Sequence, residues 1–495
     1  MNGRTRPTYL VAAALAFGAV ARSPAQNTSL DPTAALLAEL IRVNTSNPPG
    51  NTSGIAALLG PRLKALGLEV DIVQTPDSGK THLIARLRGD GSKRPVLLAA
   101  HADVVGVEPE KWTVDPFAGV VKDGYVYGRG AIDFKGGMAV FARAVMLLAE
   151  RKIPLARDVI FVAEADEEGG RYNTAWLARE QWEKIDCEFA LNEGGWIMKR
   201  DDGSVRYVSI STADKSSVAL TLTALGTSTH SSMPRPDNAI FTLSRALAKL
   251  ADYETPVRLT PSTRQFFATL ARTSGPPMSD QFRNLLTDDP ALVRQADREI
   301  SKDPLLHALM RNTIAPVTMN AGFRNNVIPG SAEATINMRV IPGTDQSELV
   351  RELERVIGDP RVTVRLGGGR GGGAGAGRAG VDTTRPARGV AGGAGGGGGR
   401  SASQPSPEDT ELFRALSKEA RAQFSGADVT PYLFQAGTDA GAWRSRGVPV
   451  YGIYPYPISA DELTRMHGND ERVSIESLRQ GTEMIFRTLV DVAKR

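Results

Sequence analysis

The stretch "DVIFVAEADEEGG", residues 158–170, joins a buried strand directly to a run of acids. Residues 159–163 form a short apolar run rich in β-branched and aromatic side chains, which indicates a buried β-strand. The run leads into Asp166, Glu167 and Glu168. Adjacent carboxylates repel one another, and their removal from water is unfavourable unless a cation or hydrogen bonds compensate. The stretch therefore predicts a strand that ends at a cation site.

Apolar strand-like runs alternate with segments of helical periodicity on both sides of this stretch. The strand-like runs are residues 69–73, 82–88 and 95–105, and the helical segments are residues 31–43, 55–66 and 139–150. Such alternation is typical of an α/β layer with a mostly parallel sheet and helices on its faces. We therefore predict a large α/β domain built from residues 26–213 and 408–495.

The pattern changes near residue 213. Residues 217–226 alternate like a half-exposed strand, and they are followed by a helix at 239–253, strands at 315–323 and 330–343, a helix at 345–357 and a strand at 361–366. Strand, helix, two strands, helix, strand is the order of a small ferredoxin-like α+β unit. We predict such a unit, here called the lid, over residues 214–366. Residues 254–312, which are polar and interrupted by prolines, are predicted to be a helical insertion within it.

Residues 367–407 are dominated by glycine. This composition cannot bury enough apolar surface to offset the chain entropy, so the segment is predicted to be a disordered linker. RNA binding through its arginines is an alternative, but arginines dispersed among glycines are usually solvated. The net charge of +4 is small for 495 residues, and no basic stripe alternates with aromatic residues. We therefore expect no nucleic-acid partner.

The first residues have the pattern of a secretory signal. Arg4 and Arg6 precede an apolar run at 8–21, and small residues at 23–25 offer a cleavage site near Ala25. The run is too short to span a bilayer comfortably, which disfavours the alternative of an uncleaved membrane anchor. We expect a secreted or periplasmic protein with no stable membrane span after cleavage. The single cysteine, Cys187, excludes an intrachain disulfide framework.

Acids and histidines stand at the ends of the predicted strands or in glycine-rich turns. The relevant segments are "LLAAHAD" at 97–103, "GRGAIDFKGG" at 128–137, "ADEEGG" at 165–170, "FALNEGG" at 189–195 and "TRMHGND" at 464–470. In an open α/β sheet, ligands bind beyond the carboxyl ends of the strands. Each segment alone has an ordinary explanation as a core histidine, a turn former or a solvated acid pair. Two imidazoles and several carboxylates together match the ligand preference of zinc, and two zinc ions can share a water molecule.

The motifs as a set resemble a known enzyme family. Besides the strand-end segments they include "GTSTHSSMP" at 226–234, "NNVIPGSAEATINMR" at 325–339 and "GTDAG" at 437–441, in family order and over essentially the whole chain beyond the signal. The sequence resembles the di-zinc exopeptidase and aminoacylase family that includes carboxypeptidase G, acetylornithine deacetylase and succinyl-diaminopimelate desuccinylase. Residues 101–119 look most like the branch of carboxypeptidase S and the N-acyl-amino-acid hydrolases.

This resemblance implies two Zn²⁺ ions, for which Co²⁺ or Mn²⁺ would be substitutes. The implied metal ligands are His101 and Glu193 for one ion, Glu168 and His467 for the other, and Asp133 as the bridge. Asp103 would orient His101, and Glu167 would be the general base that handles the proton of the shared water. The resemblance also implies a cis peptide bond after Asp133, whereas it assigns no chemistry to Asp166.

The lid carries the remaining implied functional residues. His230 would stabilise the tetrahedral oxyanion, often in the site of the other subunit of a dimer. Arg339 would bind the terminal carboxylate of the substrate, with Asn326 as a further polar contact. Gly437 and Thr438, in the catalytic domain, would line the pocket. The alternative for His230 and Arg339 is an ordinary surface position.

The sequence thus predicts an exported di-zinc hydrolase that cleaves an amide or peptide bond next to a free carboxylate. It leaves open whether the enzyme is a carboxypeptidase, a dipeptidase or a deacylase of N-acyl amino acids. A di-zinc aminopeptidase would lack the α+β lid, a binding protein without activity would lack a ligand or Glu167, and an interaction protein would be built around the glycine-rich tract. The expected partners are a small peptide or N-acyl amino acid substrate and a second copy of the chain, bound through the lid.

Overall fold

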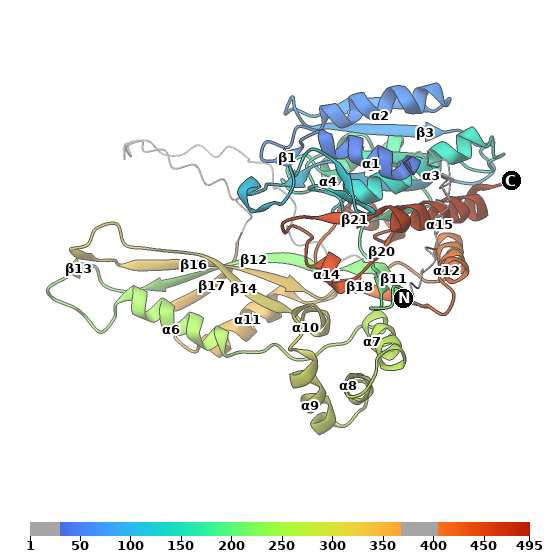
Figure 1. The fold of residues 1–495 in the computed structure, drawn as a ribbon. Coiled ribbons are helices and arrows are strands. Elements are labelled where there is room, and N and C mark those ends of the chain that lie inside the picture. Colours follow the sequence, from blue (N-terminus) through green and yellow to red (C-terminus); the bar gives the residue numbers. More distant parts are fainter. Residues whose placement is uncertain (1–29, 368–403) are drawn as a thin grey trace, which may run out of the picture.

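The computed structural model describes residues 30–367 and 404–495. The predicted signal peptide and most of the predicted linker lie outside these residues. Within them, a large mixed sheet with helices on both faces carries a smaller antiparallel sheet that projects to one side (Figure 1). The predicted combination of an α/β layer and an α+β lid is therefore confirmed.

The large sheet is parallel at its centre, and both antiparallel and parallel pairs join the strands outside the centre. Its strand order is β2-β3-β8-β4-β9-β19-β11-β10-β20, with β18 paired to β11. The strands are β2 (Glu69–Gln74), β3 (Thr81–Leu87), β4 (Val96–His101), β8 (Val159–Glu164), β9 (Phe189–Asn192), β10 (Ile197–Lys199), β11 (Val205–Asp214), β18 (Asp428–Phe434), β19 (Val450–Gly452) and β20 (Pro457–Ile458). Strands β8, β4, β9 and β19 run in the same direction, so their carboxyl ends share one edge.

The register of β4 and β8 places the first site residues side by side. His101, the last residue of β4, is the sheet partner of Glu164, the last residue of β8. Both strands are buried along their whole length, as expected for central parallel strands. The acids that follow Glu164 therefore emerge beside His101.

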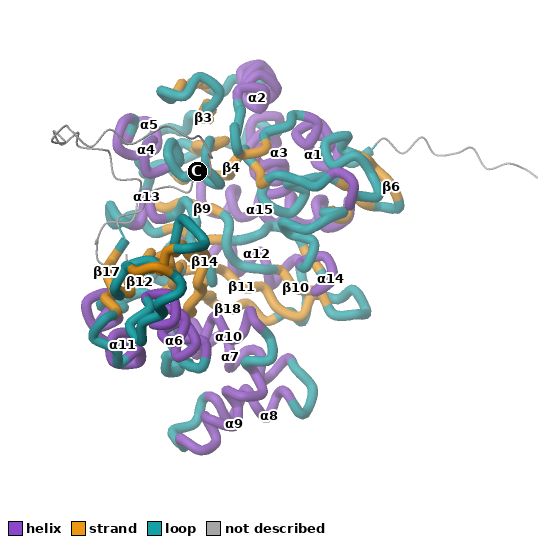
Figure 2. The backbone as a smooth tube through the Cα atoms, turned by 90° about the vertical axis from the view of Figure 1, so that its left-hand side faces the viewer, coloured by secondary structure: helices purple, strands orange, loops and turns teal. Residues whose placement is uncertain are grey.

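Side chains of the central strands alternate between two buried layers. Leu98 and Ala100 of β4 belong to one hydrophobic core, whereas Leu97 and Ala99 belong to the other. The first layer packs against α1, α3 and α15 and the second against α4, α5 and α13, on opposite sides of the strands in Figure 2. These and two further helices of the domain are α1 (Pro32–Arg42), α2 (Ser53–Ala65), α3 (Lys135–Glu150), α4 (Thr174–Glu180), α5 (Trp182–Ile185), α12 (Glu411–Gln423), α13 (Gly441–Arg444) and α15 (Ile475–Ala493).

Short elements complete the large domain around the site. They are β1 (Ser46–Asn47) paired with β5 (Val104–Val105), the three-stranded sheet of β6 (Val120–Lys122), β7 (Tyr125–Tyr127) and β21 (Arg472–Ser474), the 3₁₀ turn η1 (Pro109–Lys111), and α14 (Ala460–Leu463). The predicted single strand over 95–105 is thus interrupted after His101, because the chain turns there to bring β5 against β1.

The lid sheet has the ferredoxin-like order predicted from the sequence. Its strands β14 (Thr313–Ala321), β16 (Ser331–Val340), β12 (Ser216–Leu225) and β17 (Val362–Leu366) are antiparallel neighbours in this order. Helices α6 (Ala239–Ala251) and α11 (Gln346–Ile357) cover one face and form its core, while a short pair, β13 (Thr229–His230) and β15 (Val327–Ile328), extends beyond the sheet (Figure 1). The uncovered face is polar and carries Arg339.

The helical insertion is confirmed, but it packs differently from the prediction. It contains α7 (Pro261–Thr273), α8 (Met278–Leu285), α9 (Pro290–Ile300) and α10 (Pro304–Met310). Phe266, Phe267 and Phe282 belong to the core of the large domain, where α7 lies against β11 and β18. The insertion is therefore part of the lid in sequence and part of the large domain in space.

The first connection between the two sheets, from β11 to β12, is short. Lys215 alone separates β11 from β12, and its buried ammonium group donates to the carbonyl oxygens of Ala308 (2.8 Å) and Arg311 (2.7 Å). Residues 404–407, which we predicted as linker, are already docked, since the Ser406 hydroxyl donates to the Val450 carbonyl at 2.8 Å.

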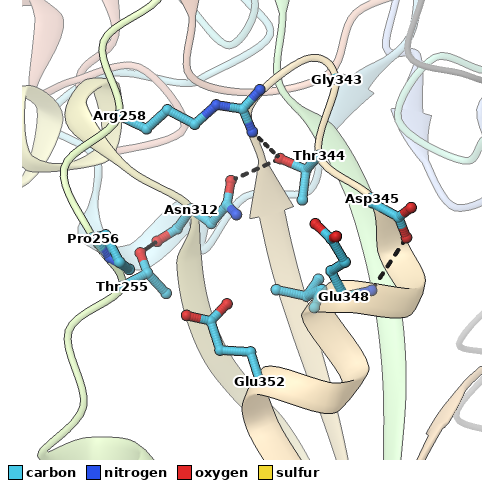
Figure 3. Close-up of a pocket in the computed structure, with 10 residues that line it drawn as sticks. Thr255, Pro256, Arg258, Asn312, Gly343, Thr344, Asp345, Glu348 and Glu352 are labelled. Carbon is cyan, nitrogen blue, oxygen red and sulfur yellow. Dashed lines mark hydrogen bonds between the residues drawn. The ribbon is translucent and has the colours of Figure 1, made fainter.

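A pocket of about 210 Å³ lies where the insertion meets the lid (Figure 3). Its polar groups are bonded to one another, because Thr344 lies within 3.3 Å of both Arg258 and Asn312, and Asp345 caps α11 through the amide of Glu348 at 3.1 Å. These contacts fix the junction of the two units, so we assign the pocket a structural role.

Candidate metal centre

One edge of the large sheet gathers the predicted metal ligands. His101 ends β4, Glu193 follows β9, and Glu168 lies in the turn after β8. Asp133 lies just before α3, after which the Asp133–Phe134 peptide bond is cis, as the family resemblance implied. His467 comes from the loop between α14 and β21, more than 270 residues further along the chain than Glu193. The structure therefore brings all five predicted ligands to one place.

The first cluster consists of His101, Asp133 and Glu193, all of them buried. His101 Nε2 lies 3.2 Å from Asp133 Oδ1 and 3.4 Å from Glu193 Oε2. His101 Nδ1 is 2.9 Å from the carbonyl oxygen of Asp103, which fixes the ring with Nε2 turned towards the two acids.

The second cluster consists of Asp133, Glu168 and His467, and it is more open to solvent. His467 Nε2 lies 2.8 Å from Asp133 Oδ2 and 3.3 Å from Glu168 Oε1. Asp133 therefore presents a different carboxylate oxygen to each histidine. This is the arrangement expected of a residue that bridges two metal ions.

The spacing and chemistry of these atoms fit divalent metal ions. Ligand atoms about 2.0–2.2 Å from a tetrahedral zinc ion are roughly 3.3–3.6 Å from one another, and three of the four distances between ligand atoms given above lie close to this range. Glu168 Oε1 is also buried without a hydrogen-bond partner among the described residues. Imidazole nitrogen with carboxylate oxygen suits zinc, and cobalt and manganese accept the same donors.

The electrostatics of the cluster favour a cation. The close contacts with the carboxylates of Asp133 and then Glu168 raise the pKa of His467 to about 10. Burial raises the pKa of Glu193 to about 8. Burial opposes protonation of His101, yet Glu193 and Asp133 raise its pKa well above its usual range. A site that attracts protons this strongly has a negative potential that metal ions can neutralise.

Glu167 and Glu168 point to different places although they are adjacent. Glu168 belongs to the second cluster, whereas Glu167 belongs to neither. Burial, followed by the negative charge of Glu193, raises the pKa of Glu167 well above its usual range. Glu167 is therefore next to the ligands and free of them, as the predicted general base must be.

Asp103 contacts the site differently from the prediction. Its carboxylate Oδ1 is 3.8 Å from His101 Nδ1, and the closer acceptor for the imidazole is its own carbonyl oxygen. The carboxylate instead accepts the backbone N–H groups of Glu167 and Glu168, each at 3.1 Å. The residue thus orients His101 through its backbone and holds the acidic turn through its side chain.

The predicted lid residues fall into two groups. Arg339 is brought to the large domain, because its guanidinium lies 3.6 Å from the point that a Cβ would occupy at Gly437. The neighbouring Thr438 hydroxyl donates to Asp214 at 2.6 Å. His230 ends β13, which lies at the far end of the lid (Figure 1), and the carbonyl oxygen of Asn326 accepts the N–H of the next residue, Ser231, at 3.0 Å. His230 and Asn326 are exposed, and the structure does not bring them to the metal ligands of their own chain.

Comparison with known proteins agrees with this geometry. Residues 97–491 match the model of peptidase family M20/M25/M40. The chain belongs to this family. It is accordingly a metallopeptidase or amidohydrolase, as predicted. Among the helices of residues 30–367 and 404–495, none has both the length and the apolar character needed to cross a membrane.

Curated relatives of this M20 chain carry three different names. "Probable carboxypeptidase S-like 2" of Dictyostelium discoideum is 29% identical over 82% of this chain and 73% of its own length. The human "N-fatty-acyl-amino acid synthase/hydrolase PM20D1" is 27% identical over 83% of this chain and 76% of its own length. A succinyl-diaminopimelate desuccinylase of Methylobacterium is 36% identical over 44% of this chain and 54% of its own length.

Solved structures show the same fold at low sequence identity. An M20 metallo-carboxypeptidase, Sso-CP2 of Sulfolobus solfataricus, aligns with a TM-score of 0.65 and 16% identity over 94% of this chain and 99% of its own. Human carnosine dipeptidase 1 aligns with a TM-score of 0.60 and 16% identity over 93% of this chain and 95% of its own. Both likenesses confirm the fold of the M20 chain.

Two residues of this M20 site were missed in the sequence. The hydroxyl of Tyr454, buried beyond the end of β19, lies 3.0 Å from Asp133 Oδ1 and 3.2 Å from Glu193 Oε2. Glu471 accepts the backbone N–H groups of Ile132 (2.7 Å) and Asp133 (3.0 Å). Because site residues follow the carboxyl ends of parallel strands, the segment after β19 was a place to look for Tyr454.

Glu471 also links Asp133 to the distant His467. Its carboxylate is paired with Arg129 at 2.6 Å, and Arg129 donates to the carbonyl oxygen of His467 at 3.2 Å. Both members of the pair are buried. The pair therefore holds the backbones of Asp133 and His467 in fixed relation, a role that residue type alone does not reveal.

Proposed function

We propose that this M20 chain is a two-zinc hydrolase that cleaves an amide or peptide bond next to a free carboxylate. The observation that carries the proposal is Asp133, whose two oxygens face His101 and His467 in separate clusters. Two zinc ions bound there would polarise an amide carbonyl and lower the pKa of a water molecule. Cobalt or manganese would substitute for zinc, since both accept the same donors.

Glu167 is assigned the proton transfer. It is adjacent in sequence to Glu168 and belongs to neither cluster, and its surroundings favour its protonated form. It would take a proton from the attacking water molecule and deliver it to the nitrogen of the leaving amine. A group that first accepts a proton and then donates it is needed, because an amine leaves poorly unless it is protonated.

The substrate class follows from Arg339 and from the relatives. A guanidinium that lies beside Gly437 on the polar face of the lid is suited to bind a carboxylate with two parallel hydrogen bonds. A carboxypeptidase S-like protein and an N-fatty-acyl-amino acid hydrolase are among the relatives. A C-terminal peptide bond and an N-acyl amino acid share an amide next to a free carboxylate, and we propose that chemistry here.

A substrate panel tests the proposal. The zinc-loaded enzyme is assayed with N-acyl amino acids, with dipeptides and with the same compounds carrying an amidated carboxyl group, and then with cobalt or manganese. Hydrolysis of one free-carboxylate class, with little turnover of its amidated partner, is expected. Turnover only of amino-acid anilides that lack a carboxylate would indicate an aminopeptidase, and binding without turnover would indicate an inactive binding protein.

Replacement of Arg339 by alanine will raise KM for free-carboxylate substrates by about 10- to 100-fold, the cost of losing a hydrogen bond to a charged group. KM for amidated substrates will change little, because they lack the negative charge. Arg351→Ala is the matched control, since Arg351 is exposed on α11, on the opposite face of the lid sheet. Equal increases of KM for free and amidated substrates would exclude a carboxylate-binding role.

His230 is proposed to act in the site of a second copy of the chain. It is exposed on β13, which lies at the end of the lid that projects away from the large domain (Figure 1). The edge strand β14 is exposed along most of its length and presents Val317 and Met319, with Phe241 exposed on α6. An unpaired edge with apolar side chains is suited to pairing with another copy.

Mixing two inactive variants tests this arrangement. His230→Ala and Glu167→Gln will each lose most of their activity alone, and a refolded mixture will recover activity, because a mixed dimer has one site with Glu167 and the partner's His230. The expected yield is about a quarter of the wild-type rate, since half the dimers are mixed and each has one complete site. Recovery of no activity, or a monomeric mass by light scattering, would contradict the proposal.

Export is the remaining part of the proposed function. It rests on the basic and apolar pattern of residues 4–25, which lie outside the described residues. Sequencing the N-terminus of the protein recovered from the periplasm or medium should give a start just after Ala25. An N-terminus that retains the apolar run would support a membrane anchor instead.

A further inference from the structure

One side-chain amide connects two buried carboxylates beside the metal centre. Asn47 Nδ2 donates to Asp103 Oδ2 at 2.7 Å and to Asp166 Oδ1 at 2.9 Å. Neither carboxylate is exposed to solvent. Asn47 belongs to β1, in the segment between α1 and α2 that carries none of the predicted site residues.

Both carboxylates hold the turn that carries the two functional glutamates. Asp103 accepts the backbone N–H groups of Glu167 and Glu168, as described above. Asp166 accepts those of Arg171 at 3.0 Å and Tyr172 at 2.7 Å through its other oxygen. The turn is thus held at its acidic residues by one carboxylate and at its far end by the other, and the amide of Asn47 joins the two holders.

The negative charges of Asp103 and Asp166 make the amide donor of Asn47 necessary. Asp166 has a positive φ of 68°, in the left-handed region that few non-glycine residues adopt. Lys80 pairs with Asp166, whereas Asp103 has no lysine or arginine among its bonded partners in the described residues. Without the Asn47 N–H groups, two buried carboxylates would lie near each other with Lys80 paired to Asp166 alone, and they would repel.

The packing leaves the amide of Asn47 little freedom. A Cβ at Gly50, where φ is +73°, would lie 2.8 Å from Asn47 Cγ, and a Cβ at Gly169 would lie 2.6 Å from Asn47 Nδ2. The Gly169 Cβ would also overlap Asp166 Oδ1. Two glycines therefore enclose the amide and fix its direction.

We infer that Asn47 is a positioning residue for the hydrolytic reaction: through Asp103 and Asp166 it sets where Glu167 and Glu168 stand relative to the metal ions. The inference rests on the proposed function and adds to it a residue that touches neither substrate nor metal. Polar groups that orient ligands and bases in this way typically account for about 10- to 100-fold in activity or metal affinity.

Asn47→Ala and Asn47→Asp test the inference in the zinc-loaded full-length enzyme. Both will lower kcat by about 10- to 100-fold with KM within about twofold, because the base is misplaced while substrate binding is kept. Asn47→Asp keeps the size of the side chain but replaces the donor by a third carboxylate, so it will be at least as impaired as Asn47→Ala. A residue needed only for packing would tolerate this isosteric change.

Asn44→Ala is the matched control, because Asn44 lies in the same segment, is exposed and accepts only the N–H of Ser46 at 3.0 Å. It will keep wild-type kcat. A double-mutant cycle supplies the second readout: in a Glu167→Gln background, Asn47→Ala will lower the residual rate by less than about twofold, since its effect passes through that turn.

Two outcomes would overturn the inference. One is wild-type kcat in Asn47→Asp, and the other is an equal loss from Asn47→Ala with and without Glu167. These outcomes differ from failure of the proposed function, in which the wild-type enzyme itself hydrolyses none of the substrates in the panel.

Discussion

Replacement of Glu167 by glutamine will lower kcat by about 10²- to 10⁴-fold, the range expected when a general acid–base group is removed. Glutamine has nearly the same size and keeps the backbone N–H that Asp103 accepts. It cannot take a proton from the attacking water or deliver one to the leaving amine. Because Glu167 belongs to neither metal cluster, the variant will still bind two metal ions per chain.

The matched control is Glu168→Gln, one residue further along the same turn. This variant loses a ligand of the second cluster, so its metal content will fall towards one ion per chain. Metal content by elemental analysis and kcat by initial rates distinguish the two roles. Metal loss in Glu167→Gln with retention in Glu168→Gln would mean that the assigned roles of the two glutamates are reversed.

Removal of the metal ions will lower the melting temperature by roughly 5–15 °C at pH 8, because the ions bind the folded chain and not the unfolded one. Without them, buried carboxylates of like charge face one another across the centre. Differential scanning calorimetry of the zinc-loaded and chelated enzyme measures the difference, and addition of zinc after chelation should restore the original value.

The chelated enzyme should also lose stability as the pH rises. The pKa of Glu193 is about 8 in the folded state against 4.5 for an ordinary glutamate, and that of His467 is about 10 against 6.5. Both values are raised on folding, so from pH 6 to 9 the folded chain binds more protons than the unfolded chain. The free energy of unfolding therefore falls over this range.

Zinc reverses this dependence, since its ligands must be deprotonated and its affinity rises with pH. Asp133 contributes nothing to the change above pH 6, because its pKa is lowered and its stabilisation is already complete there. The difference in melting temperature between the two forms should consequently widen from pH 6 to pH 9. A constant or narrowing difference would contradict the proposed ligand set.

The sequence predicted the centre well where chemistry and secondary structure coincide. Parallel strands end at one edge, so the acids after β8 and β9 and His101 at the end of β4 had to meet there. His467 could be placed with them only through the family resemblance, because a loop residue far along the chain has no periodic signal. The same holds for Asp133 as the bridge.

What the sequence could not predict depends on backbone atoms and on long-range packing. The carbonyl of Asp103, and not its carboxylate, is the close acceptor for His101. The insertion packs on the large domain because Phe266 and Phe267 fit beneath β11 and β18, which its polar, proline-interrupted sequence did not reveal. Asn47, in the segment between the predicted helices 31–43 and 55–66, is the clearest case of a contact without a sequence signal.

The most direct test of the whole account is the anomalous scattering of a zinc-loaded crystal. Two peaks about 3.5–4 Å apart are predicted. One should lie between His101 and Glu193 and the other between Glu168 and His467, with Asp133 between them. A single peak, or two peaks at which His101 and His467 share no bridging carboxylate, would contradict the assignment of this chain as a two-metal hydrolase.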